Sequence, residues 1–393
     1  MDYIAQANRI SDELAEIRHS LHAHPEIGLS EFETAERIER ELQACGIKTE
    51  RILGTAVIGT LCGALPGRAA ALRADIDALP IAEKTMCDFA STVPDVMHAC
   101  GHDCHTAAVI GAAKLLAANS DKLHGTVKFF FQPDEEGCGG ARRMVECGCL
   151  SNPHVDAVFG MHVSPDLPLG TVGVRYGKFY AASNTFKVTV HGRSSHGAEP
   201  EKGIDALAAA VELLTEIRSF RQEMREKHGP LVITVGQLHS GTAGNIIADT
   251  AEFEGIIRTL GPEARAETVS GFEKLIESVS LKCGVKTDIV MRESYPGVVN
   301  DDEAAAFVEA QARKLFGDER VTVIEQPTMT TEDFGYFLNE RPGAFFHFGV
   351  GGGYPLHNPC FLPDDSMLPQ AAALFAQIIT SFLNDGDIST EDR

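Results

Sequence analysis

Short apolar runs alternate with helical segments through the first half of the chain, and few folds accommodate that order. Runs that predict strands cover 70–75, 126–132 and 156–160, and the spacing predicts a helix from about 106 to 118 between the first two. Apolar strands separated by helices are typical of a mostly parallel sheet covered by helices on both faces. The sequence therefore predicts the α/β class.

A capping-box pattern marks the start of one early helix. Ser30 is followed three residues later by Glu33, and apolar residues then recur at helical spacing up to Gly46. We therefore expect the side chain of Ser30 to cap this helix.

The middle of the chain has a different pattern, which indicates a second domain. Three strands with partial alternation and two long amphipathic helices are expected there, at 185–190, 231–238, 250–257, 206–227 and 262–280. After Pro296 the α/β pattern returns. We expect a discontinuous α/β domain at 1–182 and 296–393, with a smaller α+β domain inserted at 183–295.

Charge and cysteine content exclude several classes of protein. The chain has 34 basic and 56 acidic side chains and a net charge of −22, so neither nucleic acid nor an anionic membrane surface is an expected partner. No apolar stretch reaches the ~18 residues that a membrane span needs, and residues 1–26 lack the apolar core of a signal peptide. The 10 cysteines form no CxxC pair. We expect a cytoplasmic protein with reduced thiols, and neither a zinc ribbon nor a thioredoxin site.

Residues 97–105 are the densest group of reactive side chains, with three histidines and two cysteines in nine positions. Cys100 and His102 could both serve a metal site, because the glycine between them lets the backbone turn tightly. One alternative is that Cys100 and a histidine form a nucleophilic pair. The other is a purely structural role, in which the cysteine is buried and the histidines are hydrogen-bonded within the fold. The residues alone leave these choices open.

Further polar residues stand where predicted strands end. Asp75 and Asp77 share a face at one strand end, Glu135 and Glu136 follow a second, and His162 ends a third. Each of these alone is more often structural than functional. Together with the 97–105 group and with His357, however, they supply enough N, S and O donors for a site that holds two metal ions.

Motifs spread over nearly the whole chain carry a family resemblance; they occur in order at 18–26, 73–80, 97–106, 132–137, 160–162, 191–200, 241–249, 255–259, 331–334 and 357–359. With them the sequence resembles the amidohydrolase branch of the M20 family of metallopeptidases. The resemblance implies a zinc-peptidase-like catalytic domain with a mostly parallel mixed sheet, plus an inserted dimerisation or lid domain. It also implies a homodimer or a tetramer.

The resemblance implies two divalent metal ions per subunit, zinc first, with manganese, cobalt and nickel also open. The metal ligands that it implies are Cys100, His102, Glu136, His162 and His357. Glu135 would be the general base, and Asp75 or Asp77 would orient a ligand.

For the substrate, the resemblance implies that His196 reaches the scissile carbonyl across a dimer and that Asn245 and Arg258 hold a free carboxylate. Ala248 stands where relatives usually have proline, which leaves the preferred amino acid undetermined. The implied reaction is hydrolysis of an N-acyl-L-amino acid to a carboxylic acid and a free amino acid. A dipeptidase or carboxypeptidase on the same metals is the main alternative; a thiol hydrolase built on Cys100 and a non-catalytic binding protein are the others.

Overall fold

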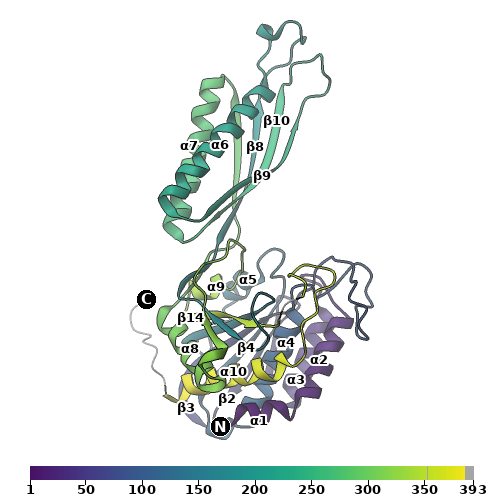
Figure 1. The fold of residues 1–393 in the computed structure, drawn as a ribbon, viewed down its shortest axis with the longest axis vertical. Helices are drawn as coiled ribbons and strands as arrows, with labels where there is room; N and C mark the ends of the chain where they lie inside the picture. The colour runs from purple at the N-terminus through teal and green to yellow at the C-terminus, as the bar shows by residue number, and fades with distance from the viewer. Residues whose placement is uncertain (352, 386–393) are drawn as a thin grey trace. The chain divides into compact units, whose positions relative to one another are not determined.

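The computed structural model describes residues 1–351 and 353–385, and the chain divides into two compact units (Figure 1). Unit 1 consists of Met1–Gly177, Asn300–Gln326 and the chain from Asp333 onward. Unit 2 consists of Lys178–Val299 and Pro327–Glu332.

Unit 1 is built on an eight-stranded sheet. Its centre, β4-β3-β5-β14, is parallel, as is the edge pair β6-β13, whereas β1-β2, β2-β4 and β14-β6 are antiparallel. The strands in sheet order are β1 (Lys48–Ile52), β2 (Ala56–Cys62), β4 (His124–Gln132), β3 (Leu65–Asp75), β5 (Ala157–Ser164), β14 (Gly343–Gly349), β6 (Val172–Val174) and β13 (Val321–Val323). The prediction of an α/β fold with a mostly parallel central sheet is confirmed.

Helices pack on both faces of this sheet. On one face α4 and α10 pack against each other and against β3, and Phe129 and Phe131 of β4 belong to the same core. Phe130 points to the opposite face, as strand alternation requires, and its ring stacks on Phe337 of α9 at 5.6 Å between centroids. The helices of unit 1 are α1 (Tyr3–Asn8), α2 (Ser11–Ala23), α3 (Phe32–Ala44), α4 (His102–Ala117), α5 (Gly140–Glu146), α8 (Asp302–Phe316), α9 (Gly335–Leu338) and α10 (Met367–Asp385).

The start of helix α3 differs from the expected capping box. Its N-cap residue is Glu31, and no side chain at that position caps the helix. The carboxylate of Glu26 instead accepts hydrogen bonds from the backbone N–H groups of Glu33 at 3.2 Å and Thr34 at 2.8 Å. The prediction for Ser30 is wrong because a residue of the preceding loop already satisfies the free N–H groups of the first turn.

Unit 2 is an antiparallel sheet with two helices. Its strand order is β11 (Lys286–Glu293), β8 (Ala182–His191), β10 (Thr250–Thr259) and β9 (Leu231–Ser240). The helices α6 (Ala206–His228) and α7 (Pro262–Cys283) pack on each other and on the sheet, and together they bury an apolar core of their own. A separate two-stranded sheet pairs β7 (Gly177–Tyr180) with β12 (Val298–Asn300).

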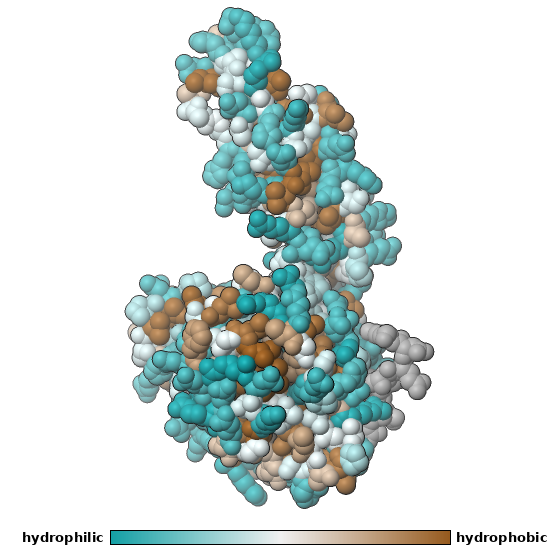
Figure 2. Space-filling model, turned by 180° about the vertical axis from the view of Figure 1, so that it is seen from behind, coloured by the Kyte–Doolittle hydropathy of each residue, from teal (hydrophilic) through white to brown (hydrophobic). Residues whose placement is uncertain are grey.

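The face of the molecule in Figure 2 is mainly hydrophilic, with hydrophobic residues gathered in patches on each unit. Within the described ranges, no helix combines the length and the apolar character needed to cross a bilayer.

Candidate metal centre

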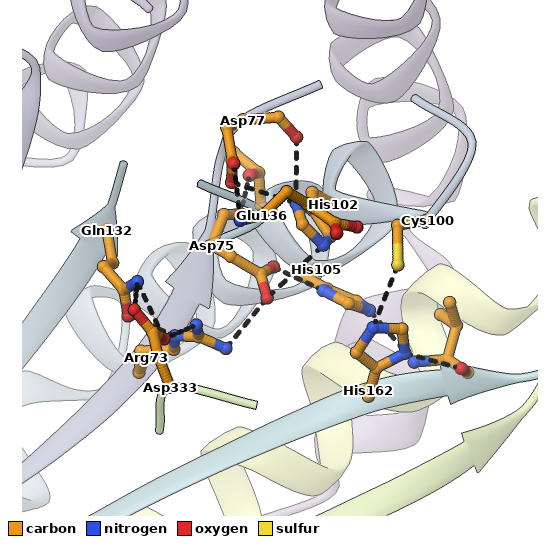
Figure 3. Close-up of polar contacts among 12 residues, drawn as sticks. Arg73, Asp75, Asp77, Cys100, His102, His105, Gln132, Glu136, His162 and Asp333 are labelled. Atoms are coloured by element: carbon orange, nitrogen blue, oxygen red, sulfur yellow. Dashed lines mark hydrogen bonds and ion pairs between the residues drawn. The ribbon is translucent and has the colours of Figure 1, made fainter. Parts of the chain in front are cut away.

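Polar side chains converge where the central strands of unit 1 end (Figure 3). Asp75 is the last residue of β3, Glu135 and Glu136 follow the end of β4, and His162 lies near the end of β5. Helix α4 begins at His102, directly after the turn at Gly101. Since the carboxyl ends of parallel strands meet at one edge, the topology brings these residues together.

The donor atoms form two groups that share Cys100. One is Cys100, His102 and His162, and the other is Cys100, Glu136 and His357; within each group the ligand atoms lie within 4.8 Å of one another. Cys100 Sγ is 3.4 Å from His162 Nε2, and His357 Nε2 is 2.9 Å from Glu136 Oε1. The residues expected to bind metal are thus all at this edge of the sheet.

The backbone fixes which nitrogen of each buried histidine is free for a metal. His102 Nδ1 lies 2.8 Å from the carbonyl oxygen of Asp77, and His162 Nδ1 lies 2.8 Å from the carbonyl oxygen of Val163. A carbonyl only accepts, so both rings donate from Nδ1, and Nε2 is the nitrogen left for a metal, which would take the place of any proton there. Among the described residues, none makes a hydrogen bond with His102 Nε2. Both rings therefore present the same nitrogen, Nε2, for metal binding.

Asp77 connects two of the expected ligands. One of its carboxylate oxygens is 3.2 Å from His102 Nδ1, and the other accepts a hydrogen bond from the backbone N–H of Glu136 at 3.0 Å. The side chain is buried. This geometry is typical of a carboxylate that orients ligands and does not itself bind the metal.

The cluster has more negative charge than its own cations balance. Burial, followed by the nearby Glu136 and Glu135 carboxylates, raises the pKa of the Cys100 thiol well above its usual range. Burial opposes protonation of His102, but Asp75 and Asp77 outweigh it and raise its pKa to about 10. A thiol in this field stays protonated, which disfavours Cys100 as a nucleophile. A divalent cation at the donor atoms would stabilise the thiolate, so these residues fit a metal site.

Two unusual backbone conformations shape the centre. Gly101 has φ 86°, and a Cβ there would lie 2.5 Å from the side chain of Val163. His357 has φ 62°, which is uncommon for a residue with a side chain, and its N–H donates to the carbonyl of Ala99 at 2.8 Å. The hydrogen bond from His357 to Ala99 holds the loop of His357 against the segment that leads to Cys100.

The three residues expected to bind substrate belong to unit 2. His196 and Asn245 are neighbours, because the N–H of Gly197 donates to the carbonyl of Asn245 at 2.8 Å. Arg258 is near the far end of β10, a strand of 10 residues that begins after Asn245, so the two lie roughly 25–30 Å apart. Within one chain, Asn245 and Arg258 therefore do not converge on a single carboxylate.

Of the buried network behind the donor groups, the sequence singled out Asp75 and gave no role to Arg73, Asp333 or His105. Arg73 contacts Asp75, Gln132 and Asp333, and His105 contacts Asp75 (Figure 3). The available signal was the position of Arg73, two residues before Asp75 in a strand expected to be buried, where a charge needs partners.

Comparison with known proteins gives the family. Residues 71–381 match the model of peptidase family M20/M25/M40. This chain belongs to that family. It is therefore a hydrolase of a peptidase family, and the resemblance of its motifs to M20 enzymes is confirmed.

Relatives with different activities match almost the full length. The N-acetylcysteine deacetylase of Bacillus subtilis is 38% identical over 93% of this chain and 95% of its own. The hippurate hydrolase of Campylobacter jejuni is 33% identical over 98% of this chain and 100% of its own. Thermostable carboxypeptidase 1 of Saccharolobus solfataricus is 35% identical over 95% of this chain and 96% of its own. The solved structure of a dinuclear metal-binding M20 peptidase from Bacillus subtilis superposes with a TM-score of 0.85, at 35% identity, and covers 96% of this chain and 99% of its own.

Proposed function

We propose that this protein is a metal-dependent amidohydrolase that cleaves N-acyl-L-amino acids to a carboxylic acid and a free amino acid. The observation that carries the proposal is the pair of donor groups sharing Cys100, with the Glu135 carboxylate within 4.8 Å of ligand atoms of His102 and Glu136. The similarity to a deacetylase and to a hippurate hydrolase, both named for acyl-amino-acid substrates, supports the substrate class.

The metal centre in this proposal holds two divalent ions, bound by Cys100, His102, Glu136, His162 and His357. Thiolate is a soft ligand, which favours zinc, whereas the imidazole and carboxylate donors also suit manganese, cobalt or nickel. When bound, such ions supply Lewis acidity, which polarises an amide carbonyl and makes a water molecule easier to deprotonate.

Glu135 is the proposed general base. Its side chain is buried at the end of β4 and lies beside the donor groups, where it would take a proton from the attacking water. The same carboxyl group would then deliver that proton to the amine that leaves. Asp77 supports this step from behind, because it holds both His102 and the backbone of Glu136.

The proposed substrate contacts come from unit 2, which we take to be the dimerisation and lid domain expected at 183–295. The N–H of Ala198 donates to His196 Nδ1 at 3.0 Å, so the neutral ring has its proton on Nε2 and can donate it to a carbonyl oxygen. Arg258 can bind a carboxylate with two parallel hydrogen bonds. Because Asn245 and His196 lie beyond the start of β10 and Arg258 lies near its end, we assign the two sets of contacts to different copies in a homodimer.

A carboxypeptidase activity is the second candidate, because thermostable carboxypeptidase 1 is about as similar to this chain as the deacetylase is. Both activities would use the same metals and Glu135, and they differ in what stands on the acyl side of the bond. A cytoplasmic location belongs to the proposal as well, and cell fractionation tests it.

A substrate panel tests the proposed function. Acetyl, benzoyl and succinyl derivatives of several amino acids are compared with matched dipeptides and longer peptides, before and after EDTA treatment and after metal is restored. We expect hydrolysis of acyl amino acids that EDTA abolishes and added metal restores. Cleavage of peptides alone would support the carboxypeptidase, and activity that resists EDTA but is lost on alkylation would refute the metal centre.

A further inference from the structure

His105 lies at the centre of the metal-binding cluster, although both of its ring nitrogens face protein groups. We infer that His105 is a positioning residue which, backed by Asp75 and Arg73, fixes His162 and so sets the metal affinity of one donor group only. The inference rests on the proposed metal centre and adds a division of labour between its two halves.

The hydrogen bonds of His105 exclude it as a ligand. Its Nδ1 is 2.5 Å from a carboxylate oxygen of Asp75, and its Nε2 is 2.9 Å from the backbone nitrogen of Val163. A backbone N–H only donates, so Nε2 must accept and the ring proton must be on Nδ1, donated to Asp75. Neither nitrogen has a lone pair left for a metal, even though Asp75, His102 and His105 lie close enough together to hold one.

The contact with Val163 carries this constraint to His162. His105 holds the N–H of Val163, while the carbonyl of the same residue accepts the Nδ1 hydrogen of His162 at 2.8 Å. The rings of His105 and His162 also meet edge to face, with centroids 4.6 Å apart. Both backbone polar groups of Val163 are therefore fixed, and with them the end of β5 that directs His162 Nε2 at Cys100 (Figure 3).

Asp75 is itself fixed from behind. Arg73 donates to Asp75 at 2.8 Å, to Gln132 at 2.8 Å and to Asp333 at 2.9 Å, and Gln132 donates to Asp333 as well. The side chains of Arg73, Asp75 and Asp333 have 0% exposure in these ion pairs. Buried charges are tolerated only when their partners are held in good geometry, so this network makes the Asp75 carboxylate a rigid support for His105.

The other donor group is held differently. His357 stands in a loop with its side chain 50% exposed, and its side chain contacts Glu136, itself a proposed ligand. The two groups have Cys100 in common, and His105 touches only the side of His162. A change at His105 should therefore weaken one metal-binding step and leave the other.

Two substitutions separate the two hydrogen bonds of His105. The amide of Gln reaches the position of Nε2 and can accept from Val163, whereas the amide of Asn reaches the position of Nδ1 and can donate to Asp75 only. Metal-free protein is titrated with Co²⁺, and the thiolate-to-cobalt absorption and the visible spectrum are followed. The variant His357→Ala identifies which step belongs to which group.

We expect His105→Asn to weaken the His162 step by about 100-fold and His105→Gln by about 10-fold, the usual range for partners of metal ligands, with the other step unchanged. His98→Asn is the matched control: His98 is as buried as His105, and among the described residues none makes a hydrogen bond with its ring. In His98→Asn, the Co²⁺ affinity of both steps should stay within about twofold of that of the unaltered protein.

Equal weakening of both steps, or no change in either variant, would overturn the inference. If His105→Asn does not fold, as thermal unfolding of the metal-free protein would show, His105→Gln decides by the same criterion. Failure of the unaltered protein to bind Co²⁺ would instead overturn the proposed function.

Discussion

The two donor groups differ in how the fold holds them. His162 lies on a central strand, is 7% exposed, and is fixed through Val163 and His105. His357 lies in a loop with an unusual positive φ of 62°, its side chain is half-exposed, and a backbone hydrogen bond to Ala99 ties it to the cluster. One half of the centre is thus part of the core, and the other half is attached to it.

This difference has a physical consequence. A ligand whose ring is held by a second layer of hydrogen bonds loses little conformational freedom when a metal binds, whereas a ligand in a loop must be ordered. We therefore expect the His162 group to bind metal first and more tightly. The His357 group should exchange its metal more readily, because water reaches its side chain.

The largest effect is expected from a substitution that abolishes catalysis and leaves both metal-binding donor groups intact. Glu135→Gln keeps the size of the side chain but removes the base, so kcat should fall by about 10²–10⁴ while both Co²⁺-binding steps persist. Glu146→Gln, at a side chain that is 64% exposed on α5, is the control and should keep full activity. Retained turnover in Glu135→Gln would refute its role as the base, and lost metal would make it a ligand.

The next effect tests the contrast directly through stability. His162→Ala removes a buried ring and leaves Val163 with an unpaired carbonyl, so the metal-free protein should lose about 1–3 kcal/mol of unfolding free energy. His357→Ala changes a half-exposed side chain and should stay within about 0.5 kcal/mol. Denaturant unfolding of both variants in EDTA measures this. Equal losses would mean that the two halves are equally integrated.

Local pattern was enough to single out the residues that the fold brings together, and the resemblance of the motifs proposed their roles. Their spacing within 97–105 and their positions after apolar strands follow from sequence, because the topology of a parallel sheet gathers strand ends at one edge. The central strands and the long helices of unit 2 were predictable for the same reason: their periodicity is strong over many residues.

What could not be predicted depends on partners that are distant in sequence. The carboxylate that caps α3 belongs to Glu26 and not to a residue of the expected capping box. Arg73 donates a hydrogen bond to Asp333, which is 260 residues away in the sequence. The role of His105 depends on a single backbone N–H of β5, which no pattern encodes. The separation of Asn245 from Arg258 shows the converse: the length of a strand that is predictable from sequence is enough to keep two residues of one chain from meeting at a single carboxylate.

The smallest expected effect concerns an anchor that connects the two halves. Asp103, next to His102, accepts hydrogen bonds from Arg18 at 3.0 Å and His22 at 2.8 Å, and Arg18 also donates to the carbonyl of Pro363, beyond His357, at 2.7 Å. His22 Nε2 is in addition 3.1 Å from Glu83. The imidazole thus stands between two carboxylates and should be protonated, which keeps the anchor together.

The stability from this anchor should decrease with pH. Burial opposes protonation of His22, but Asp103 and Glu83 outweigh it and raise its pKa to about 9, against about 6.5 in an unfolded chain. The folded state therefore keeps a proton that the unfolded state loses, so the contribution is complete below about pH 6.5 and is lost as pH rises through 9. One retained proton corresponds to about 1 kcal/mol between pH 7 and pH 8. Denaturant unfolding of the metal-free protein and of His22→Asn across this range isolates the effect, because the other titrating groups are common to both. If the difference between the two proteins did not shrink with rising pH, His22 would be neutral in the fold, and the anchor would depend on Arg18 alone.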